Sequence, residues 1–189
     1  MKHPDDVLDA ANAASFPASD PPAQVSIATA GEPAETDEGI PQEVFRVVRA
    51  GEAGQAFAAQ EHYAASRWTS AGMPAVYAAY GAAVALLEFL AHLEGETPDD
   101  LALVHACVPR TQVWLDPPLP PDWNHFPYLQ DVQAIGDRWM QERQALGIRL
   151  PSALVPGECN LLVNPLHPHI GKVQIKSICR ITLDARLRT

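Results

Sequence analysis

Three polar side chains in a mostly apolar stretch, Arg67, Tyr77 and Glu88, have the types and spacing that could do chemistry. Between Gly81 and His92 every residue is apolar except Glu88, and a buried carboxylate is costly unless something pairs with it. An arginine, an aromatic hydroxyl and a carboxylate are groups that can hold an anionic nucleotide and cleave a glycosidic bond. The alternative is a buried Arg67–Glu88 ion pair beside a core tyrosine, and the spacing alone leaves both open.

A short strand and the helix after it would position these groups. The pattern predicts a strand at 75–78, followed by a helix at 81–93 that is buried on most sides because it lacks a polar face. Tyr77 and Glu88 then lie on adjacent elements, and Arg67 precedes them across a loop with glycine and proline. All three side chains could therefore line one cleft.

The rest of the chain from residue 43 onward mixes predicted strands with one amphipathic helix. That helix is expected at 131–144, with Asp131 as its N-cap and Gly147 ending it. Its apolar face would carry Val132, Ile135, Trp139 and Met140, and a proline-rich loop with Trp123, Phe126 and Tyr128 precedes it at 115–130. Further strands are expected at 44–48, 101–108, 152–155, 161–163, 173–178 and 180–183. Without a regular βαβ rhythm, we expect a single α+β domain with a small mixed or antiparallel sheet.

Residues 1–40 differ in composition from the remainder. They are rich in Ala, Pro, Asp and Glu and hold few large apolar residues, so burial cannot offset their ordering entropy. We expect a flexible arm with a short helix at 5–14, and a folded domain at 41–189. A docking peptide anchored by Phe16 is the alternative for the arm.

Charge and cysteine content exclude several classes of function. The net charge is −10, from 13 basic and 23 acidic residues, so we expect no direct nucleic-acid binding and no anionic membrane surface as partner. No signal peptide and no membrane-spanning run is apparent, so a cytoplasmic protein is expected. Cys107, Cys159 and Cys179 form no CxxC pair, so we expect reduced thiols and no metal site.

Several short blocks also occur in a characteristic order and spacing. They lie at 45–47, 66–68, 72–79, 85–88, 135–139, 151–158 and 160–168. Together they resemble the RES-domain family, the toxin component of bacterial RES–Xre toxin–antitoxin pairs, over about residues 45–186. The resemblance implies an ADP-ribosyltransferase-like fold and an enzyme that depletes NAD by hydrolysis or phosphorolysis of the nicotinamide–ribose bond. NAD would be the substrate and phosphate an alternative co-substrate, with no cofactor.

The resemblance also implies roles for particular residues. Arg67, Tyr77 and Glu88 match the active-site residues, and Arg46, Ser152, Asn160 and Asn164 match substrate-binding positions. Glu88 would stabilise the developing ribosyl cation, and Arg67, assisted by Arg46, would bind the pyrophosphate. Tyr77 would stack on nicotinamide, and Ser152 would position a phosphate, ribose or acceptor oxygen. The sequence departs from the family pattern at Ser66 and Thr69, where Gly and Asn are frequent.

The resemblance further implies partners. An Xre-type helix-turn-helix antitoxin is expected to bind the toxin, and a homodimer is left open. Transfer of ADP-ribose to a protein and a non-enzymatic binding module remain alternatives. A hydrolase triad of Ser152 with His167 or His169 lacks the Gly-x-Ser-x-Gly elbow, and a metal site at those histidines lacks a third ligand.

Overall fold

The computed structural model describes residues 40–60, 63–93, 95–115 and 117–187. The chain divides into two units, Met1–Glu35 and Thr36–Thr189, and every described residue belongs to the second. The expected arm and its helix at 5–14 lie outside the described residues, apart from Ile40. Among the described residues, no helix is both long enough and apolar enough to cross a membrane.

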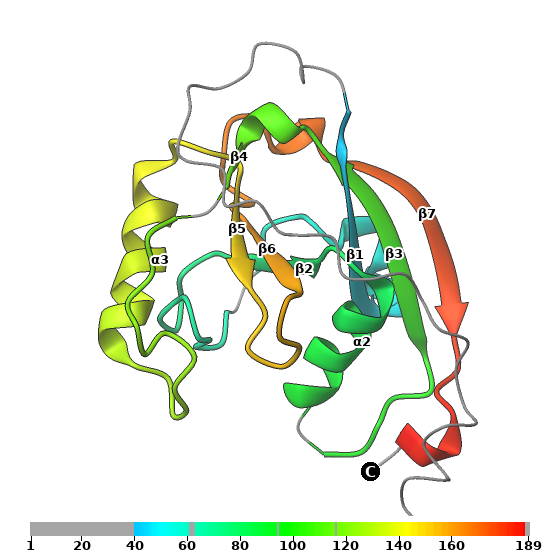
Figure 1. Ribbon diagram of the computed structural model, residues 1–189. Coiled ribbons are helices and arrows are strands. Elements are labelled where there is room, and N and C mark those ends of the chain that lie inside the picture. The colour runs from blue at the N-terminus through cyan, green and yellow to red at the C-terminus, as the bar shows by residue number, and fades with distance from the viewer. Residues whose placement is uncertain (1–39, 61–62, 94, 116, 188–189) are drawn as a thin grey trace, which may run out of the picture. The chain divides into compact units, whose positions relative to one another are not determined.

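The second unit is built, within its described residues, on a seven-stranded mixed sheet in the order β4-β5-β6-β2-β1-β3-β7 (Figure 1). All neighbouring strands pair antiparallel except β4 and β5, which are parallel. The expected α+β domain with a mixed sheet is therefore confirmed. The strands are β1 (Gln42–Arg49), β2 (Val76–Ala79), β3 (Leu101–Val108), β4 (Val113–Trp114), β5 (Gly147–Pro151), β6 (Cys159–Val163) and β7 (Gln174–Ile181).

Helices α2 (Ala82–Ala91) and α3 (Gln130–Glu142) pack on the same face of this sheet, here named the helix face. Strand residues alternate between faces, so Tyr77 and Ala79 point toward the helices while Val76 and Ala78 point away. Helix α2 covers β1 and β3, and α3 covers β5 and β6. Short 3₁₀ helices lie at η1 (Ala50–Gln55), η2 (Arg110–Gln112), η3 (Ile170–Lys172) and η4 (Ala185–Leu187).

Strands β1 and β2 meet at a narrow seam. Only Phe45 and Ala79 are paired across it among the described residues, whereas β1 and β3 pair along their full length. Beyond that pair, the guanidinium of Arg46 donates to the backbone carbonyl of Tyr77 at 2.9 Å. A side chain therefore replaces the next rung of the ladder and satisfies a strand carbonyl.

The residues expected to begin and end the second helix are wrong. Helix α3 begins after Leu129, with Asp131 inside its first turn. It ends at Glu142 and is capped by Arg143, whose φ of 51° is left-handed. Gly147 instead opens β5, a strand that the sequence analysis did not predict.

The expected strand at 152–155 is a turn, because the Ser152 hydroxyl accepts the backbone N–H groups of Leu154 and Val155 at 3.1 and 3.2 Å. The two strands expected at 173–178 and 180–183 are one continuous strand, β7.

Candidate functional site

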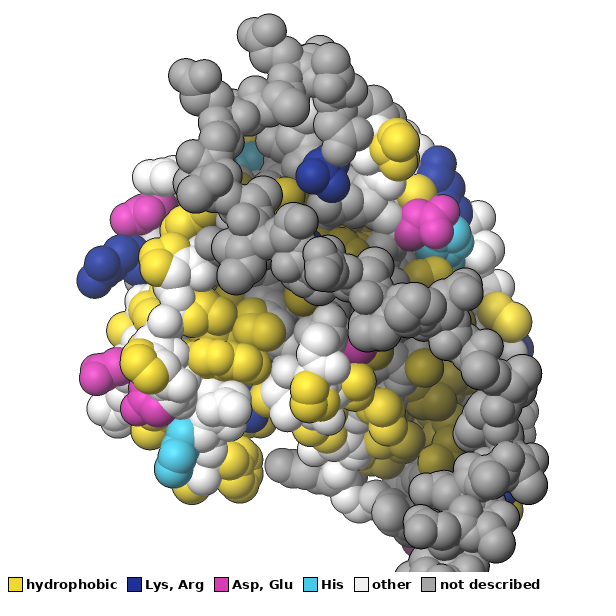
Figure 2. Space-filling model, viewed as in Figure 1, with side chains coloured by type: hydrophobic (Ala, Val, Ile, Leu, Met, Phe, Trp, Pro, Cys, Tyr) yellow, Lys and Arg dark blue, Asp and Glu magenta, His cyan; other side chains and the backbone are white. Residues whose placement is uncertain are grey.

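A cavity of about 660 Å³ lies at the seam between β1 and β2, beside α2. In the view of Figure 1, hydrophobic side chains gather beside α3 and again over α2, and the surface is notched between the two groups (Figure 2). Residues from β1, β2, β6, α2 and the loop at 60–73 line the cavity, together with Phe126 and Tyr128 from the proline-rich loop. Four of the expected site residues are among them: Arg46, Tyr77, Glu88 and Asn160.

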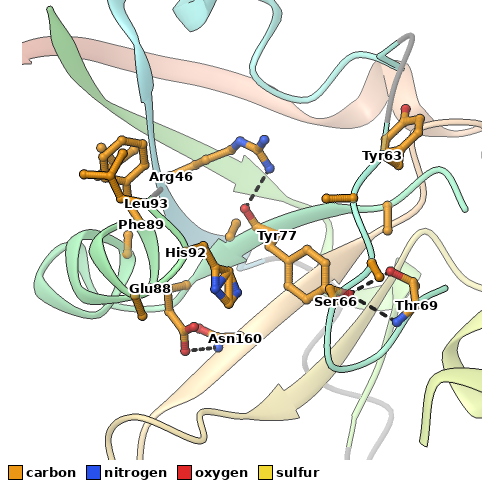
Figure 3. Close-up of a pocket in the computed structure, with 18 of the residues that line it drawn as sticks. Arg46, Tyr63, Ser66, Thr69, Tyr77, Glu88, Phe89, His92, Leu93 and Asn160 are labelled. Atoms are coloured by element: carbon orange, nitrogen blue, oxygen red, sulfur yellow. Dashed lines mark hydrogen bonds between the residues drawn. The ribbon is translucent and has the colours of Figure 1, made fainter. Parts of the chain in front are cut away.

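Glu88 is held in a fixed orientation from two sides. The Ser152 hydroxyl donates to its Oε1 at 2.9 Å. The Asn160 side-chain amide donates to the same oxygen at 2.6 Å (Figure 3). Oε2 accepts no hydrogen bond from the described residues, so it is available to a ligand. Asn160 Oδ1 is also buried and has no hydrogen-bond partner among the described residues. Ser152 does not line the cavity and acts through Glu88.

Tyr77 projects from β2 into the cavity and its hydroxyl shares a short hydrogen bond with the Ser66 hydroxyl (Figure 3). Ser66 in turn shares a hydrogen bond of 2.8 Å with the Thr69 hydroxyl. Burial raises the pKa of Tyr77 to about 12 despite these bonds. The phenol is therefore neutral at physiological pH, and its ring offers a flat surface beside the carboxylate of Glu88.

Arg46 supplies a buried positive charge on the other side of Tyr77 (Figure 3). Burial lowers its pKa to about 10, so the guanidinium still carries its charge at neutral pH. Its Nε is buried without a hydrogen-bond partner, and no carboxylate of a described residue lies within ion-pairing distance. The charge of Glu52 favours the protonated guanidinium, but no carboxylate among the described residues contacts it, so the cavity suits an anionic ligand.

Arg67 lies outside the cavity lining and is directed at the proline-rich loop instead. Its guanidinium donates to the backbone carbonyls of His125 at 2.8 Å and Trp123 at 3.3 Å. The same group lies 5.2 Å from the centroid of the Tyr128 ring. Arg67 therefore holds the loop that brings Phe126 and Tyr128 to the cavity.

Helix α3 anchors the loop that carries Ser66 and Arg67. The Gln133 side-chain amide donates to the carbonyl of Ser66 at 2.6 Å. One turn later, Asp137 Oδ1 accepts the backbone N–H of Ser70 at 2.9 Å. Two side chains on one helix face thus fix both ends of the segment from 66 to 70, which explains how a helix outside the cavity positions the hydroxyl next to Tyr77.

The contact between α3 and this loop also requires a glycine. A Cβ built on Gly136 would lie 1.8 Å from the carbonyl oxygen of Trp68, so only glycine allows the helix to approach so closely. The Trp68 ring stacks on Trp123 with centroids 5.6 Å apart, which continues the packing into the proline-rich loop. Gly136 therefore belongs to the framework of the site.

Asn164 is the expected site residue that the structure places apart from the others. It is buried, its amide donates to the carbonyl of Met140 at 2.9 Å, and its Oδ1 accepts the backbone N–H of Leu166 at 3.0 Å. Both polar atoms are used within the fold, and the residue does not line the cavity. Its contacts support a structural role.

The alternative hydrolase triad is not assembled in the structure. The hydroxyl of Ser152 donates to Glu88, not to a histidine. His167 Nδ1 accepts the backbone N–H of His169, and His169 Nδ1 donates to Gln112 at 2.6 Å. His167 is therefore engaged within its own loop, and His169 is engaged with Gln112 in η2.

Further cavity residues were not identified from the sequence: Tyr63, Ser66, Phe89 and His92. His92 follows Glu88 by four residues, so helical spacing could have found it. Arg46 was identified by resemblance alone, although it alternates with Val44 and Val48 on an otherwise apolar strand face. Ser66 has no such signal, because its role depends on the fold around Tyr77.

A known protein family matches most of the chain. The RES domain model matches residues 43–185 of the chain. A protein of Pseudomonas putida named Toxin Res is 38% identical over 128 residues, which cover 64% of this chain and 84% of the relative. A protein of Photorhabdus laumondii with the same name is 36% identical over 126 residues, covering 64% and 80%.

A third relative, from a Sphingobium species, is named Prs ADP-ribosylating toxin and is 32% identical over 127 residues, covering 64% and 79%. Among solved structures, a chain of the M. tuberculosis MbcT–MbcA toxin–antitoxin complex superposes with a TM-score of 0.50. It is 16% identical, and the match covers 76% of this chain and 85% of that chain. That likeness shows a common fold alone.

Proposed function

Because this chain belongs to the RES domain family, we propose that it is the toxin of a toxin–antitoxin pair and that it cleaves the nicotinamide–ribose bond of NAD. The observation that carries the proposal is the presence, in one cavity, of a buried guanidinium on Arg46, which has no ion-pair partner among the described residues, and an oriented carboxylate on Glu88. The pyrophosphate of NAD would bind the Arg46 guanidinium, and the ribose, which becomes cationic during the reaction, would lie beside the Glu88 carboxylate. Tyr77 lies between them.

The reaction follows from these positions. As the C–N bond lengthens, nicotinamide leaves with the bonding electron pair and the ribose develops positive charge, as in glycoside hydrolysis. The Glu88 carboxylate stabilises that charge, because the bonds from Ser152 and Asn160 already hold it in place. An oxygen of water or phosphate then bonds to the ribose carbon, and its proton passes to solvent. The stacked nicotinamide lies against the neutral Tyr77 ring.

We assign the anion site to a different arginine from the one that the resemblance implies. Arg46 lines the cavity and has a free donor, so we assign the pyrophosphate to it. Arg67 contributes indirectly, by holding the loop with Phe126 and Tyr128 over the cavity. Asn160 Oδ1 is positioned to accept a ribose hydroxyl.

Replacing Glu88 by glutamine tests the central role. Glutamine can still accept both hydrogen bonds, so the fold is retained while the charge is lost. Two unit charges about 4 Å apart attract by about 4 kcal/mol at an effective dielectric constant of about 20, so turnover should fall roughly 10³-fold. NAD binding should change little, because the lost attraction develops only in the transition state.

The assay is nicotinamide release from NAD by the purified protein. Glu142→Gln, the same change at an exposed position ending α3, is the matched control and should keep full turnover. Wild-type turnover in Glu88→Gln, or no nicotinamide release by the folded wild-type protein, would contradict the proposal.

A second candidate function is transfer of ADP-ribose to a protein, which the name of the Sphingobium relative favours. Both reactions share the first step and differ in the acceptor. NAD labelled in the adenylate distinguishes the acceptors by the labelled product. Water as acceptor should give free ADP-ribose, phosphate should give ADP-ribose phosphorylated at the ribose carbon, and a protein acceptor should itself become labelled. Running the three arms with pure toxin identifies the acceptor.

The toxin's partner is proposed to be an antitoxin of the Xre helix-turn-helix type that covers the cavity mouth. Phe126, at the cavity edge, is 72% exposed and offers an apolar contact. The chain's charge of −10 implies that DNA is reached only through the partner. Co-expression with the neighbouring open reading frame should give a heteromer without NAD turnover, and size measurement of the toxin alone tests a homodimer.

A further inference from the structure

The pairing of β1 with β3 brings three metal-binding side chains to one point on the helix face. Glu43 lies directly opposite Cys107 in the antiparallel register, and His105 lies two residues earlier on β3, on the same face. Directly opposed side chains on adjacent strands are close neighbours. One ligand atom from each of Glu43, His105 and Cys107 lies within 4.8 Å of the other two.

The His105 ring is held by stacking, and its Nε2, which has no hydrogen-bond partner among the described residues, lies close to Glu43 and Cys107. Its ring stacks on Phe45 with centroids 4.8 Å apart and planes inclined by 12°. His105 Nε2 is buried, has no hydrogen-bond partner among the described residues, and lies 3.7 Å from Glu43 Oε1. That separation is too long for a hydrogen bond, so the buried nitrogen is left unsatisfied.

The accessibility of the three groups suits an ion that enters from solvent. Cys107 is 7% exposed and lies at the base, while the Glu43 side chain is 65% exposed and lies at the entrance. A buried thiol next to an imidazole and a carboxylate is a donor set typical of zinc.

We propose that Glu43, His105 and Cys107 bind a thiophilic divalent transition metal, physiologically Zn²⁺, with water as the fourth ligand. The Cys107 thiol releases its proton to solvent as sulfur bonds to the metal, and neutral His105 binds through Nε2. Zinc bonds of about 2.0–2.3 Å place tetrahedral ligand atoms about 3.3–3.8 Å apart. The three ligand atoms, which lie within 4.8 Å of one another, must therefore move closer together as the metal binds.

The site is separate from the NAD chemistry proposed above but adjoins its cavity. Phe45, the partner of His105 in the ring stack, lines that cavity. A bound metal would join the first strand of the domain to β3 and hold the ring of Phe45 in place. Metal binding is measured without NAD, so its outcome is independent of the proposed enzymatic activity.

The test is titration of the full-length, chelator-treated protein with Co²⁺, followed by competition with Zn²⁺. The wild-type protein should bind one equivalent, with thiolate charge-transfer absorption and tetrahedral ligand-field bands that Zn²⁺ abolishes. Cys107→Ser should lose the charge-transfer band and bind at least tenfold more weakly. His105→Phe, which keeps the stack on Phe45, should also bind at least tenfold more weakly.

The matched control is Cys179→Ser, which removes an exposed thiol on β7 and should leave the titration unchanged. Zn²⁺ should raise the unfolding temperature of the wild type and of this control, but not of Cys107→Ser. The inference is overturned if the wild type binds no stoichiometric metal, or if the band survives Cys107→Ser and disappears in Cys179→Ser.

Discussion

Replacing Gly136 by alanine separates the contribution of α3 to the site from its contribution to helix stability. The new Cβ would start 1.8 Å from the carbonyl oxygen of Trp68, and such contacts are essentially never shorter than 3.0 Å. The helix and the loop must therefore separate by more than 1 Å. Alanine favours a helix over glycine by about 1 kcal/mol, whereas overpacking against a backbone that cannot rotate away costs about 1–3 kcal/mol or more.

The steric effect should win, because the displacement also strains the 2.6 Å bond from Gln133 to the Ser66 carbonyl. We expect a net loss of about 1–2 kcal/mol, which lowers the unfolding temperature by roughly 2–8 °C for a domain of this size. Turnover should fall as well, since Ser66 and Arg67 move with the loop. Thermal unfolding and nicotinamide release measure the two effects on the same preparation.

Gly54→Ala is the matched control, because nothing lies within 4 Å of a Cβ at that position in η1. It should leave turnover unchanged and alter the unfolding temperature little. If Gly136→Ala matches the wild type in both stability and turnover, α3 does not position the loop and the reasoning about the site framework is wrong.

Three further substitutions test individual contacts. Ser152→Ala removes one of the two hydrogen bonds to the Glu88 carboxylate. A hydrogen bond to a charged group contributes about 1.5–3 kcal/mol, so turnover should fall roughly tenfold to a hundredfold. Unchanged turnover would show that the hydrogen bond from Asn160 alone orients Glu88. Arg46→Met should weaken NAD binding strongly in calorimetry and change the unfolding temperature little, because the lost hydrogen bond to the Tyr77 carbonyl is offset by removal of the desolvation penalty that lowers the pKa of Arg46. Tyr77→Phe isolates a pH effect. Between about pH 10 and pH 12, Tyr77 in the folded protein keeps its proton because its pKa is raised to about 12, whereas a tyrosine in the unfolded chain, with a pKa near 10, has lost it. The difference in free energy of unfolding between the wild type and Tyr77→Phe should thus be constant below about pH 10 and decline by up to about 3 kcal/mol toward pH 12. Chemical unfolding at a series of fixed pH values measures this difference, and a value that does not change with pH would show that the burial argument is wrong.

The elements that carry the site could be predicted from the sequence because their patterns are strong. The apolar helix interrupted by Glu88 and the strand before it were found close to their observed bounds. The turn at Ser152 was not, because its hydroxyl competes for backbone N–H groups that a strand would use. Gly147 was misread as a helix end, since glycine also suits a strand where neighbouring side chains pack closely.

The contacts within the site were harder to predict, because they depend on register and on side-chain direction. Arg67 was expected at the pyrophosphate, yet its guanidinium turns to the carbonyls of a loop more than fifty residues away in sequence. The proximity of Glu43, His105 and Cys107 could not be predicted from the sequence for the same reason. Cysteine spacing reports local metal motifs, whereas these three side chains meet only when β1 and β3 align.

The single backbone pair across the β1–β2 seam has a mechanical consequence. Twisting one half of the sheet, β4-β5-β6-β2, against the other, β1-β3-β7, would break one backbone pair and the bond from Arg46 to the Tyr77 carbonyl instead of a full ladder. Amide protons beside the seam should therefore exchange with deuterium sooner than those between β1 and β3. A ligand bonded to Asn160 on one half and to Arg46 on the other would couple the two halves. Substrate binding should therefore slow the deuterium exchange of the amide protons beside the β1–β2 seam.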